Sequence, residues 1–450
     1  LSSPSESMVI GLEQGSFEPG FDSLTSWRSY ALRSRAKVGD APCDFGAWGD
    51  YLDFKIDDGS DALFDDQIIR DLHIELGQES FSLIDDEALP PGCVPYHRPY
   101  HPGTVTFDGT SYENAGVRVK GGCGSSRDLS EKASFKINLS DYGTDDTCPI
   151  TRRARGLKRI TANNQVQDPS FIHERLAYHL YDLAGVPVPR RAPIRVHVND
   201  ELWGLYLHLE SIDRRFLERR YEGLGAEGML YEGTYFCDLV PNNLPAVNGP
   251  ETCFAIKFSD ECSTPDPMGD PYNYAPLISF VNQMDALPNG GFYPAITEIL
   301  DFDTYLSQWA VEAIINHWDG GIYDILNNYR VYHDPLAGKW FMFPTGLDQS
   351  FNGNQRPIDP WDPGSVIARR CLREKPCEDA FAARLKEVLT IFENEDLPTM
   401  ANAIRNQIAA DVAADPRTES DNFNFKVNQT ISFIEGRPAQ IRAWLVEHGY

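Results

Sequence analysis

The spacing of apolar residues changes near residue 210 of this chain, and this change limits the folds open to it. Before that point, apolar and polar residues tend to alternate; Ala133, Phe135, Ile137 and Leu139 form the apolar side of one such segment. Alternation of this kind is typical of a half-buried antiparallel strand. From Ser211 onward, apolar residues mostly recur at the three- and four-residue spacing of helices. The sequence therefore predicts an α+β protein in which a β-rich part precedes a mainly helical part.

The β-rich part is expected to begin as a β-meander, and one helix should interrupt its strands. Asp168 is a suitable N-cap for this helix, Pro169 fits its first position, and Gly185 ends it. Two further strands, at 194–198 and 203–209, should follow. The expected apolar stripe of the helix consists of Ile172, Leu176, Leu180 and Leu183.

The length of 450 residues suggests two or three domains, or one two-lobed enzyme. We divide the chain into a leader over 1–60, a β-rich lobe over 61–210 and a helical lobe over 211–450. A stretch near 237–273, rich in Pro and Asn, is interpreted as an insertion in the helical lobe. In that lobe, one β-hairpin (328–332 with 340–343) should interrupt helices over 211–221, 302–317, 378–393, 397–412 and 427–448.

Acidic residues outnumber basic ones by 67 to 40, which gives a formal net charge of −27. Nucleic-acid binding is disfavoured, because affinity for phosphate backbones comes chiefly from clustered Lys and Arg. A site on an anionic membrane surface is disfavoured for the same reason. No apolar stretch approaches the roughly 20 residues of a spanning helix, so we expect no membrane span. Separately, we expect the protein to be a monomer.

The nine cysteines bear on the compartment. Cys371 and Cys377 flank one short loop, and Cys253 and Cys262 flank another, with Cys237 upstream. Neither pair has the spacing or the neighbours of a zinc site. Disulfides, which persist in oxidising compartments, are the favoured interpretation, and buried thiols in a cytosolic enzyme are the alternative. The first residues lack the features of a signal peptide but are compatible with the front of a processed chain. From the cysteine pattern we expect the mature form of an exported protein, in an extracellular, periplasmic or cell-surface location.

Two aspartates flank the predicted hairpin, and this arrangement can carry chemistry. A hairpin returns the chain to its starting edge, so Asp319 and Asp348 should lie close together, with Asn327 or Asn328 on the entering side. Oxygen ligands of this kind suit Mg²⁺ or Mn²⁺ shared with substrate phosphates. The alternative is that each aspartate only caps a turn or a helix. The order Asp, Asn, hairpin, Asp is that of phosphoryl-transfer enzymes of the protein-kinase type.

The β-rich part contains groups that would complement such a site. A glycine-rich turn can place backbone N–H groups over phosphates, although most glycines in hairpins only serve turn geometry. Lys132 and Lys136 lie on the polar side of the next strand, where each is either a phosphate contact or a solvated lysine. Glu174 lies opposite the apolar stripe of the helix and could pair with the strand lysine; a surface position is the alternative. The turn consists of Gly121, Gly122, Cys123, Gly124, Ser125 and Ser126.

From about Leu63 to Phe351, the chain resembles the spore-coat protein H (CotH) kinase family of atypical secreted or surface kinases. The segment GVRVKG at 116–121 resembles the family's GVRxRG, and KASFKINL at 132–139 resembles KKSYRIKL. Further resemblances lie at 168–185, at NDELWGLYLHLESI (199–212), at Trp318-Asp319, at NYRVY (328–332) and at LDQSF (347–351).

This resemblance implies a two-lobed protein-kinase-like fold and a kinase site. It implies that Lys132 contacts phosphate, with Lys136 as the fallback, and that Glu174 is the partner of that lysine. The remaining implied roles are Glu210 near the inter-lobe hinge beside adenine, Asp319 orienting the acceptor hydroxyl, and Asn328 and Asp348 holding metal.

The chain also departs from the family pattern. Thr345-Gly346-Leu347-Asp348 stands where the family has Trp-Asp-Leu-Asp, which keeps the metal-binding Asp but loses the Trp and the preceding Asp. Cys123 stands where Asn is common, and a disulfide to Cys148 would stiffen the turn.

We therefore expect an enzyme that binds ATP with Mg²⁺ or Mn²⁺ and phosphorylates Ser or Thr of a protein. Transfer of AMP would need the same parts with the nucleotide reversed. A catalytically silent scaffold or adhesion module would keep the fold and bind no nucleotide. A metal-dependent hydrolase is disfavoured, because the ten histidines form no HExxH or similar cluster.

Overall fold

The computed structural model describes residues 29–32, 52–55, 58–87, 98–122, 124–142, 152–221, 228–246, 253–257, 274–353, 356–418 and 420–450. The chain divides into two compact units, 1–58 and 59–450. In the first unit, strands β1 (Ser29–Leu32) and β2 (Leu52–Lys55) pair antiparallel. Most of the predicted leader over 1–60 lies outside the described residues.

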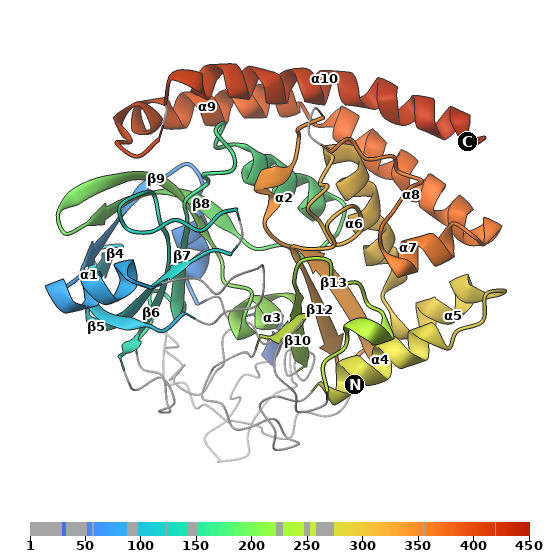
Figure 1. The fold of residues 1–450 in the computed structure, drawn as a ribbon, viewed down its shortest axis with the longest axis horizontal. Helices are drawn as coiled ribbons and strands as arrows, with labels where there is room; N and C mark the ends of the chain where they lie inside the picture. Colours follow the sequence, from blue (N-terminus) through green and yellow to red (C-terminus); the bar gives the residue numbers. More distant parts are fainter. Residues whose placement is uncertain are drawn as a thin grey trace, which may run out of the picture. The chain divides into compact units, whose positions relative to one another are not determined.

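Seven strands of the second unit form a closed barrel in the order β3-β4-β5-β6-β7-β9-β8 (Figure 1). The run from β3 to β7 follows the predicted meander, and the closure of the strands into a barrel was not predicted. Closure comes from β3 and β8, which pair in parallel although they are far apart in sequence, and no local pattern encodes such a pairing. The strands are β3 (Arg70–Glu75), β4 (His101–Phe107), β5 (Thr110–Lys120), β6 (Ser134–Asp141), β7 (Arg159–Asn163), β8 (Arg191–Val198) and β9 (Glu201–Leu209). A short helix, α1 (Gln78–Asp85), separates β3 from β4.

Strand β6 confirms the predicted alternation, because Phe135, Ile137 and Leu139 are fully buried in the barrel interior. The polar side of this strand is not solvated as a half-buried strand would be. Ser134 and Asn138 are also buried, each with 1% of its surface exposed. The outer face of the barrel is therefore covered by other parts of the second unit at this point.

Helix α2 (His173–Leu183) starts four residues later than the predicted first position, Pro169. Asp168 still serves this end of the helix, since its carboxylate accepts hydrogen bonds from the backbone N–H groups of Ser170 (2.9 Å) and His173 (2.8 Å). Between them, Phe171 has a φ of 57°, so the chain makes a turn that the pattern does not predict. The predicted stripe buries Ile172, Leu176 and Leu180, but Leu183 is exposed.

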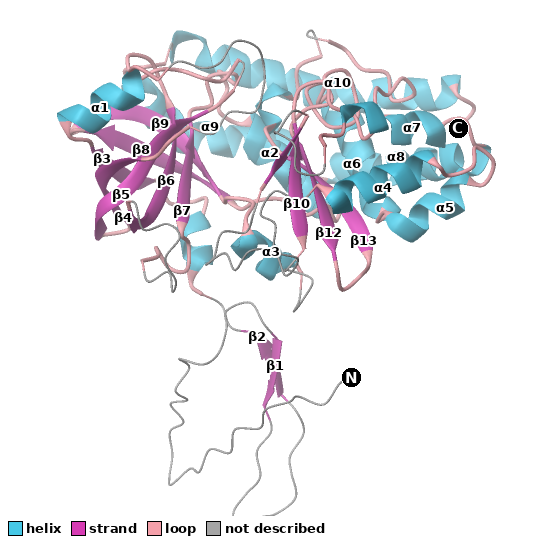
Figure 2. Cartoon of the chain, turned by 60° about the horizontal axis from the view of Figure 1, so that its bottom comes forward, coloured by secondary structure: helices cyan, strands magenta, loops and turns pink. Residues whose placement is uncertain are grey.

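The helical part contains a second sheet, with strand order β11-β10-β12-β13. The predicted hairpin is confirmed as β12 (Tyr329–Asp334) and β13 (Lys339–Pro344). The expectation of a lone hairpin is wrong, because β10 (Met229–Gly233) and β11 (Phe254–Ile256) extend it. These two strands are too short to show a clear period in the sequence. Figure 2 shows the barrel and this sheet as separate groups of strands with α2 between them.

The helices surround the second sheet and also reach the barrel. Helix α6 is buried almost all round, which is typical of a central helix. Helices α9 and α10 run along one side of the second unit, from the barrel to α8 (Figure 1). The predicted long helices are confirmed, whereas α4, α5 and α7 were not predicted. The helices are α3 (Arg214–Arg220), α4 (Ala275–Asp285), α5 (Phe292–Ile299), α6 (Phe302–Ile315), α7 (Val366–Cys371), α8 (Lys375–Asn394), α9 (Leu397–Ala414) and α10 (Phe423–Glu447).

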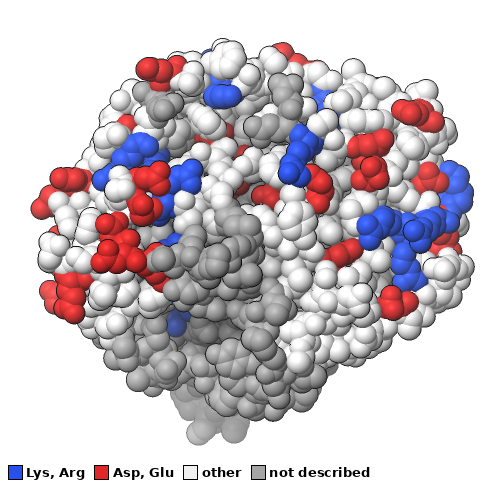
Figure 3. Space-filling model, viewed as in Figure 1, with Lys and Arg blue, Asp and Glu red and all other residues white. Residues whose placement is uncertain are grey.

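The α+β expectation is thus confirmed, with one apolar core inside the barrel and a larger one among the helices. A two-lobed protein-kinase-like arrangement and the boundaries at 60 and 210 stay predictions. No helix in the described part of the chain is long and apolar enough to cross a membrane. On the face drawn in Figure 3, acidic and basic side chains are interspersed.

Two disulfides are formed among the described residues. Cys371–Cys377 joins α7 to α8, as the spacing predicted. Cys253 pairs with Cys237 and not with Cys262, which corrects the other predicted pair. The backbone explains this choice, since Thr234 donates a hydrogen bond from its N–H to the carbonyl of Cys253 and brings the two segments together. The disulfide suggested for Cys123 and Cys148 lies outside the described residues.

Candidate active site

The loop that carries Asp319 follows α6 and is held by a buried carboxylate of that helix. Asn316 ends the helix in the left-handed conformation, with a φ of 56°. The Glu312 carboxylate accepts hydrogen bonds from the backbone N–H groups of Gly321 (3.3 Å) and Ile322 (3.1 Å). Burial raises the pKa of Glu312 to about 8. The Glu312 carboxylate therefore holds the loop in place at Gly321 and Ile322, shortly after Asp319.

Asp319 and Asn328, both expected on the entering side of the hairpin, are in direct contact. The Asn328 side-chain amide donates to the Asp319 carboxylate (2.9 Å) and to its backbone carbonyl (3.1 Å). The amide of Asn327 donates to the other carboxylate oxygen at 3.3 Å. At the exit of the hairpin, a Cβ on Gly346 would lie 2.5 Å from the Asn328 side-chain oxygen. Glycine at 346 thus permits the two ends of the hairpin to meet.

The environment of Asp319 suits a group that exchanges a proton near neutrality. Only 7% of Asp319 is exposed. Burial raises its pKa to about 7; the charge of Asp348 acts in the same direction, and the hydrogen bonds from Asn327 and Asn328 oppose it. A general base works best when its pKa lies near the working pH.

Asp348 and Glu174 form a second group of carboxylates. Burial and, to a smaller extent, the charge of Asp348 raise the pKa of Glu174 to about 8. Burial and the charge of Asp168 likewise raise the pKa of Asp348. One oxygen of Glu174 accepts a hydrogen bond from the Asn163 amide (2.6 Å), while the other oxygen is buried with no partner among the described residues. Asp348 is thus linked electrostatically to both Asp319 and Glu174.

This acidic group fits a divalent cation. Buried carboxylates that repel one another, with an orphaned oxygen, are stabilised by a positive charge. No set of three or more Asp, Glu, His or Cys side chains in the described part of the chain could hold a metal by itself. Mg²⁺ commonly takes one or two carboxylates and completes its coordination with water and substrate phosphates. The donor set therefore suits a metal that arrives with a phosphate ligand.

Lys120, and not Lys132, lies beside Glu174. The Asn163 amide joins them: its oxygen accepts from the Lys120 ammonium (3.3 Å) and its nitrogen donates to Glu174. Burial lowers the pKa of Lys120, and the charges of Glu174 and Asp348 oppose this shift. The signal was present in the sequence, because Val117 and Val119 alternate with Lys120, which directly precedes the glycine-rich turn.

Lys136 lies in a group of cations on the outer face of the barrel. Burial and the positive charges of Arg159, Arg118, Lys257 and Arg330 hold its pKa well below the usual range. Across the strands, Lys136 is directly opposite Arg118. The Lys136 ammonium forms no hydrogen bond or ion pair with a side chain within the described ranges, and Glu232 is a carboxylate on which its charge acts. A bound anion would reduce the repulsion among these positive charges.

Arg330 and Glu232 connect the cation group to the acidic one. Glu232 pairs with Lys257 (2.7 Å) and with Arg330 (2.9 Å). Two other nitrogens of the Arg330 guanidinium are buried and have no partner among the described residues. Lys120 is within electrostatic reach of Glu174 and Asp348 on one side and of Glu232 and Arg330 on the other. It therefore marks the place where the two groups meet.

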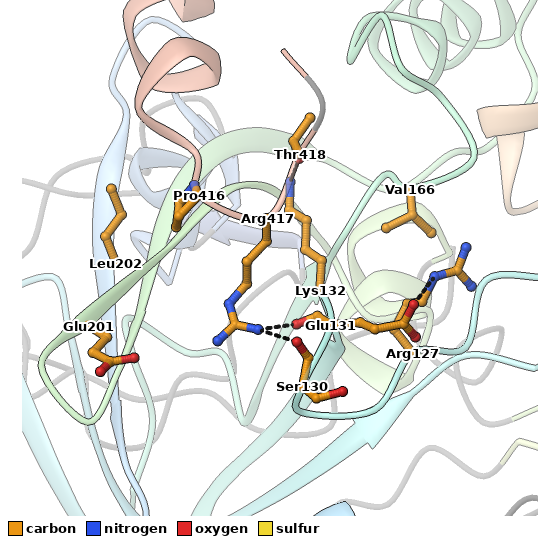
Figure 4. Close-up of a pocket in the computed structure, with 10 residues that line it drawn as sticks. All are labelled: Arg127, Ser130, Glu131, Lys132, Val166, Glu201, Leu202, Pro416, Arg417 and Thr418. Atoms are coloured by element: carbon orange, nitrogen blue, oxygen red, sulfur yellow. Dashed lines mark hydrogen bonds and ion pairs between the residues drawn. The ribbon is translucent and has the colours of Figure 1, made fainter.

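Lys132 is instead part of a buried ion pair with the turn between α9 and α10. Its ammonium lies 2.6 Å from the Asp415 carboxylate and 3.0 Å from the Thr418 hydroxyl. It borders an open pocket of about 870 Å³ (Figure 4), in which Arg417 reaches the backbone carbonyls of Ser130 and Glu131. The charge of Lys132 is thus neutralised by Asp415, on a different part of the chain from Glu174. Lys132 is the single predicted site residue that lines this pocket.

Glu210 is also engaged by arginines. Its carboxylate pairs with Arg190 (2.7 Å) and Arg219 (2.5 Å), and it accepts from the Arg190 N–H (3.0 Å). Burial raises the pKa of Glu210, but the two arginines outweigh this effect and lower it overall. The side chain is buried between β8, β9 and α3, where it fixes the strand end rather than facing an open site.

The glycine-rich turn follows Lys120 directly. Gly121 and Gly124 have φ values of 114° and 83°, in the region that favours glycine. The Ser126 N–H donates to the Gly122 carbonyl (3.0 Å), and the Ser126 hydroxyl accepts from Arg98 (2.9 Å). The Ser125 carbonyl accepts from the Asn164 amide (3.3 Å). The turn is therefore anchored at its far end and begins beside the acidic group.

Comparison with known proteins identifies relatives over most of the chain. Residues 117–441 match the family described as CotH kinase protein. This match starts and ends later than the resemblance found at 63–351, and it takes in α8, α9 and most of α10, where no short motif marks the sequence. Inner spore coat protein H of Bacillus subtilis is 23% identical over 298 residues, which cover 64% of this chain and 78% of that protein.

Two further relatives are similar over different lengths. Invasin CotH2 of Rhizopus delemar is 23% identical over 356 residues, which cover 73% of this chain and 56% of that protein. Inner spore coat protein H-like protein of Bacillus subtilis is 29% identical over 85 residues, or 19% of this chain.

Proposed function

Since the chain belongs to the CotH kinase protein family, we propose that it is a protein kinase that transfers the γ-phosphoryl group of ATP to a Ser or Thr hydroxyl. One observation supports the proposal: a group of cations, in which two Arg330 nitrogens have no partner among the described residues, meets a group of repelling carboxylates at Lys120. A triphosphate with its divalent cation is the ligand that would satisfy both groups together.

We assign the phosphate contacts to Lys120, Lys136 and Arg330, with the glycine-rich turn above them. Asn328 and Asp348 would hold Mg²⁺ or Mn²⁺, near the orphaned oxygen of Glu174. When bound, the cation would neutralise charge on the transferred group. Lys132 becomes a structural residue in this assignment, and Glu174 keeps its predicted role as the partner of a strand lysine.

Asp319 would act on the acceptor. It would accept the proton of the Ser or Thr hydroxyl as that oxygen bonds to the γ-phosphorus, while the bond to the β,γ-bridging oxygen breaks and ADP leaves. Asn327 and Asn328 fix the carboxylate, and the Glu312 network fixes the loop that carries it. Most of the catalysis would come from positioning and charge stabilisation.

The acceptor is proposed to be an exported or surface protein. The two disulfides support this setting, because disulfides persist in oxidising compartments. The intact mass of a modified acceptor distinguishes phosphate transfer from AMP transfer. A scaffold without a nucleotide site would show no thermal shift with Mg-ATP.

The substitution Asp348→Ala is expected to reduce phosphoryl transfer by more than about a hundredfold, because a bound metal supplies several kcal/mol of charge stabilisation. The measurement is Mg²⁺-dependent incorporation of phosphate into an acceptor, with a melting curve to show that the variant is folded. ATP with a chelator in place of the metal is the control for the parent protein. Turnover of the variant at the parent rate would refute the metal assignment.

The substitution Lys120→Ala is expected to weaken Mg-ATP binding by roughly tenfold or more, because a charge-assisted hydrogen bond contributes about 1.5–3 kcal/mol. Lys136→Ala should weaken binding to a smaller extent, since other cations surround it. Titration calorimetry with a non-hydrolysable ATP analogue and Mg²⁺ measures both effects. An unchanged affinity in Lys120→Ala would remove Lys120 from the site.

A further inference from the structure

The turn that contains Phe236 presents an exposed aromatic ring in a strained backbone conformation. Phe236 is 67% exposed and has a φ of 58°. A bulky side chain rarely adopts this left-handed region, whereas Gly and Asn adopt it readily. Burial in the core does not explain the residue, and the backbone disfavours it. An aromatic ring at this position therefore calls for another role.

The backbone of this turn is held in a fixed position. The Phe236 N–H donates to the Ile325 carbonyl (2.8 Å), and the Cys237 N–H donates to the Thr234 carbonyl (3.1 Å). Cys237 is also joined to Cys253 by a disulfide, and its carbonyl accepts a hydrogen bond from the Tyr329 hydroxyl. A rigid aromatic side chain loses little entropy when it binds a partner.

The turn also lies against the loop of the proposed base. Tyr235 hydrogen-bonds through its side chain to Asn327, the residue that contacts Asp319. Burial raises the pKa of Tyr235 to about 12, and the charges of Asp319 and Asp348 act in the same direction. Ile325, which binds the Phe236 backbone, donates its own N–H to the carbonyl of Trp318. Phe236 is therefore attached through its backbone to the loop that carries the proposed base, and its ring is exposed beside that loop.

The polar groups of this turn already form hydrogen bonds or ion pairs, so the Phe236 ring is the group of the turn that a partner would contact. The Thr234 hydroxyl donates to the Cys253 carbonyl (2.9 Å). The Asp238 carboxylate accepts from the Val366 N–H (2.7 Å) and pairs with Arg369 (3.4 Å). A charged or polar partner would find no free carboxylate in the turn, whereas an apolar side chain could cover the ring.

We propose that Phe236 is a specificity residue that contacts a large apolar side chain of the acceptor polypeptide, close in sequence to the phosphorylated Ser or Thr. This inference rests on the proposed kinase function and names the class of its substrate. Covering the ring removes apolar surface from water on both partners, which favours acceptors that carry Leu, Ile, Met or Phe at that position. The effect falls on acceptor binding and leaves the chemical step unchanged.

The test is a peptide library with one fixed Ser or Thr in which each flanking position is varied, assayed with Mg-ATP. The parent protein should prefer a large apolar residue at one flanking position. Phe236→Asn should remove that preference and raise KM for the preferred peptide by about tenfold, with kcat within about twofold. Its melting temperature should stay the same or rise by about 1–2 °C, because Asn fits the left-handed backbone.

The matched control is Phe425→Asn, which replaces an exposed phenylalanine on α10 (59% exposed) and should leave KM unchanged. An apolar preference that survives in Phe236→Asn overturns the inference, as does a parent preference for basic residues. A melting temperature that falls by several degrees would instead give Phe236 a structural role. If the parent phosphorylates no peptide and shows no Mg-ATP shift, the proposed function fails, and this result is distinct from the other two.

Discussion

Replacing Asp319 by Asn should lower kcat for phosphoryl transfer by about 10²–10⁴-fold while Mg-ATP affinity stays close to that of the parent. Asn keeps the size of the side chain, and its single oxygen still accepts from one of the two amides of Asn327 and Asn328, but it cannot accept the proton of the acceptor hydroxyl. The measurement is single-turnover phosphorylation of the preferred peptide, with nucleotide affinity from calorimetry.

The pH dependence of kcat/KM is a second test of the role of Asp319. The pKa of Asp319 is raised to about 7, chiefly by burial. A base must be deprotonated to act, so kcat/KM of the parent should fall as the pH drops through about 7. The residual rate of Asp319→Asn should lack this acidic limb.

Asp324→Asn is the matched control, because Asp324 belongs to the same loop but is partly exposed and forms an ion pair with Arg356. Its rate and pH profile should match those of the parent, since exposed ion pairs contribute little. If Asp319→Asn phosphorylates at the parent rate, or keeps the acidic limb, another group is the base.

The hairpin end of the site could be predicted because it depends on local geometry. A hairpin brings its two ends together whatever surrounds it, so the Thr345 N–H at the exit donates to the Asn328 carbonyl at the entrance. Asp319 and Asn328 were both expected on the entering side, and they are in contact there. The helix that carries Glu174 was predicted for a similar reason, from its apolar stripe. In both cases the decisive contacts are set by a turn or a helical period.

The choice of lysine could not be predicted, because it depends on contacts between distant segments. Lys132 precedes β6 and matched the family pattern, but its charge is taken by Asp415, which is 283 residues further along the chain. Lys120 ends the neighbouring strand and reaches Glu174 through Asn163 on β7. The family motif predicts the strand. Which lysine lies beside Glu174 depends on residues that are distant in sequence, Asp415 and Asn163.

The same reasoning applies to groups that the sequence analysis did not identify. Glu312 is a buried carboxylate whose partners are backbone N–H groups, so no charge pattern in the sequence indicates its role. Glu232 lies on β10, a strand that was not predicted. The ion pair between Arg330 and Glu232 forms because β10 pairs with β12. These residues become visible only when the second sheet is known.

The Lys132–Asp415 pair leads to the largest expected effect on stability. Both side chains are almost fully buried, at 2% and 0% exposure, and Asp415 also accepts hydrogen bonds from the N–H groups of Leu205 (3.0 Å) and Arg417 (2.9 Å). Removing one charge of a buried pair leaves the other uncompensated, which costs about 3–5 kcal/mol. Asp415→Asn should therefore lower the melting temperature by roughly 5 °C or more.

The sign of the pH dependence follows from the lysine. Burial lowers the pKa of Lys132, and the charge of Asp415 opposes that shift. Without the aspartate, the folded state binds the Lys132 proton less tightly than the unfolded state does, so stability rises with pH between the lowered pKa of Lys132 in the folded state and its ordinary pKa in the unfolded state. The deficit of Asp415→Asn relative to the parent should shrink as the pH is raised toward the ordinary pKa of lysine.

A second variant separates the structural role of Lys132 from a role in nucleotide binding. Lys132→Met combined with Asp415→Asn removes the buried unpaired charge and keeps an acceptor for Leu205, so it should regain most of the lost stability and retain Mg-ATP affinity. Glu393→Gln, which breaks an exposed pair with Arg442, should change the melting temperature by about 1 °C or less. If the double variant is stable but binds Mg-ATP tenfold more weakly, Lys132 contacts phosphate after all, and the assignment to Lys120 is wrong. Retained affinity in the double variant, set against its loss in Lys120→Ala, would place the phosphate-binding lysine at the end of β5.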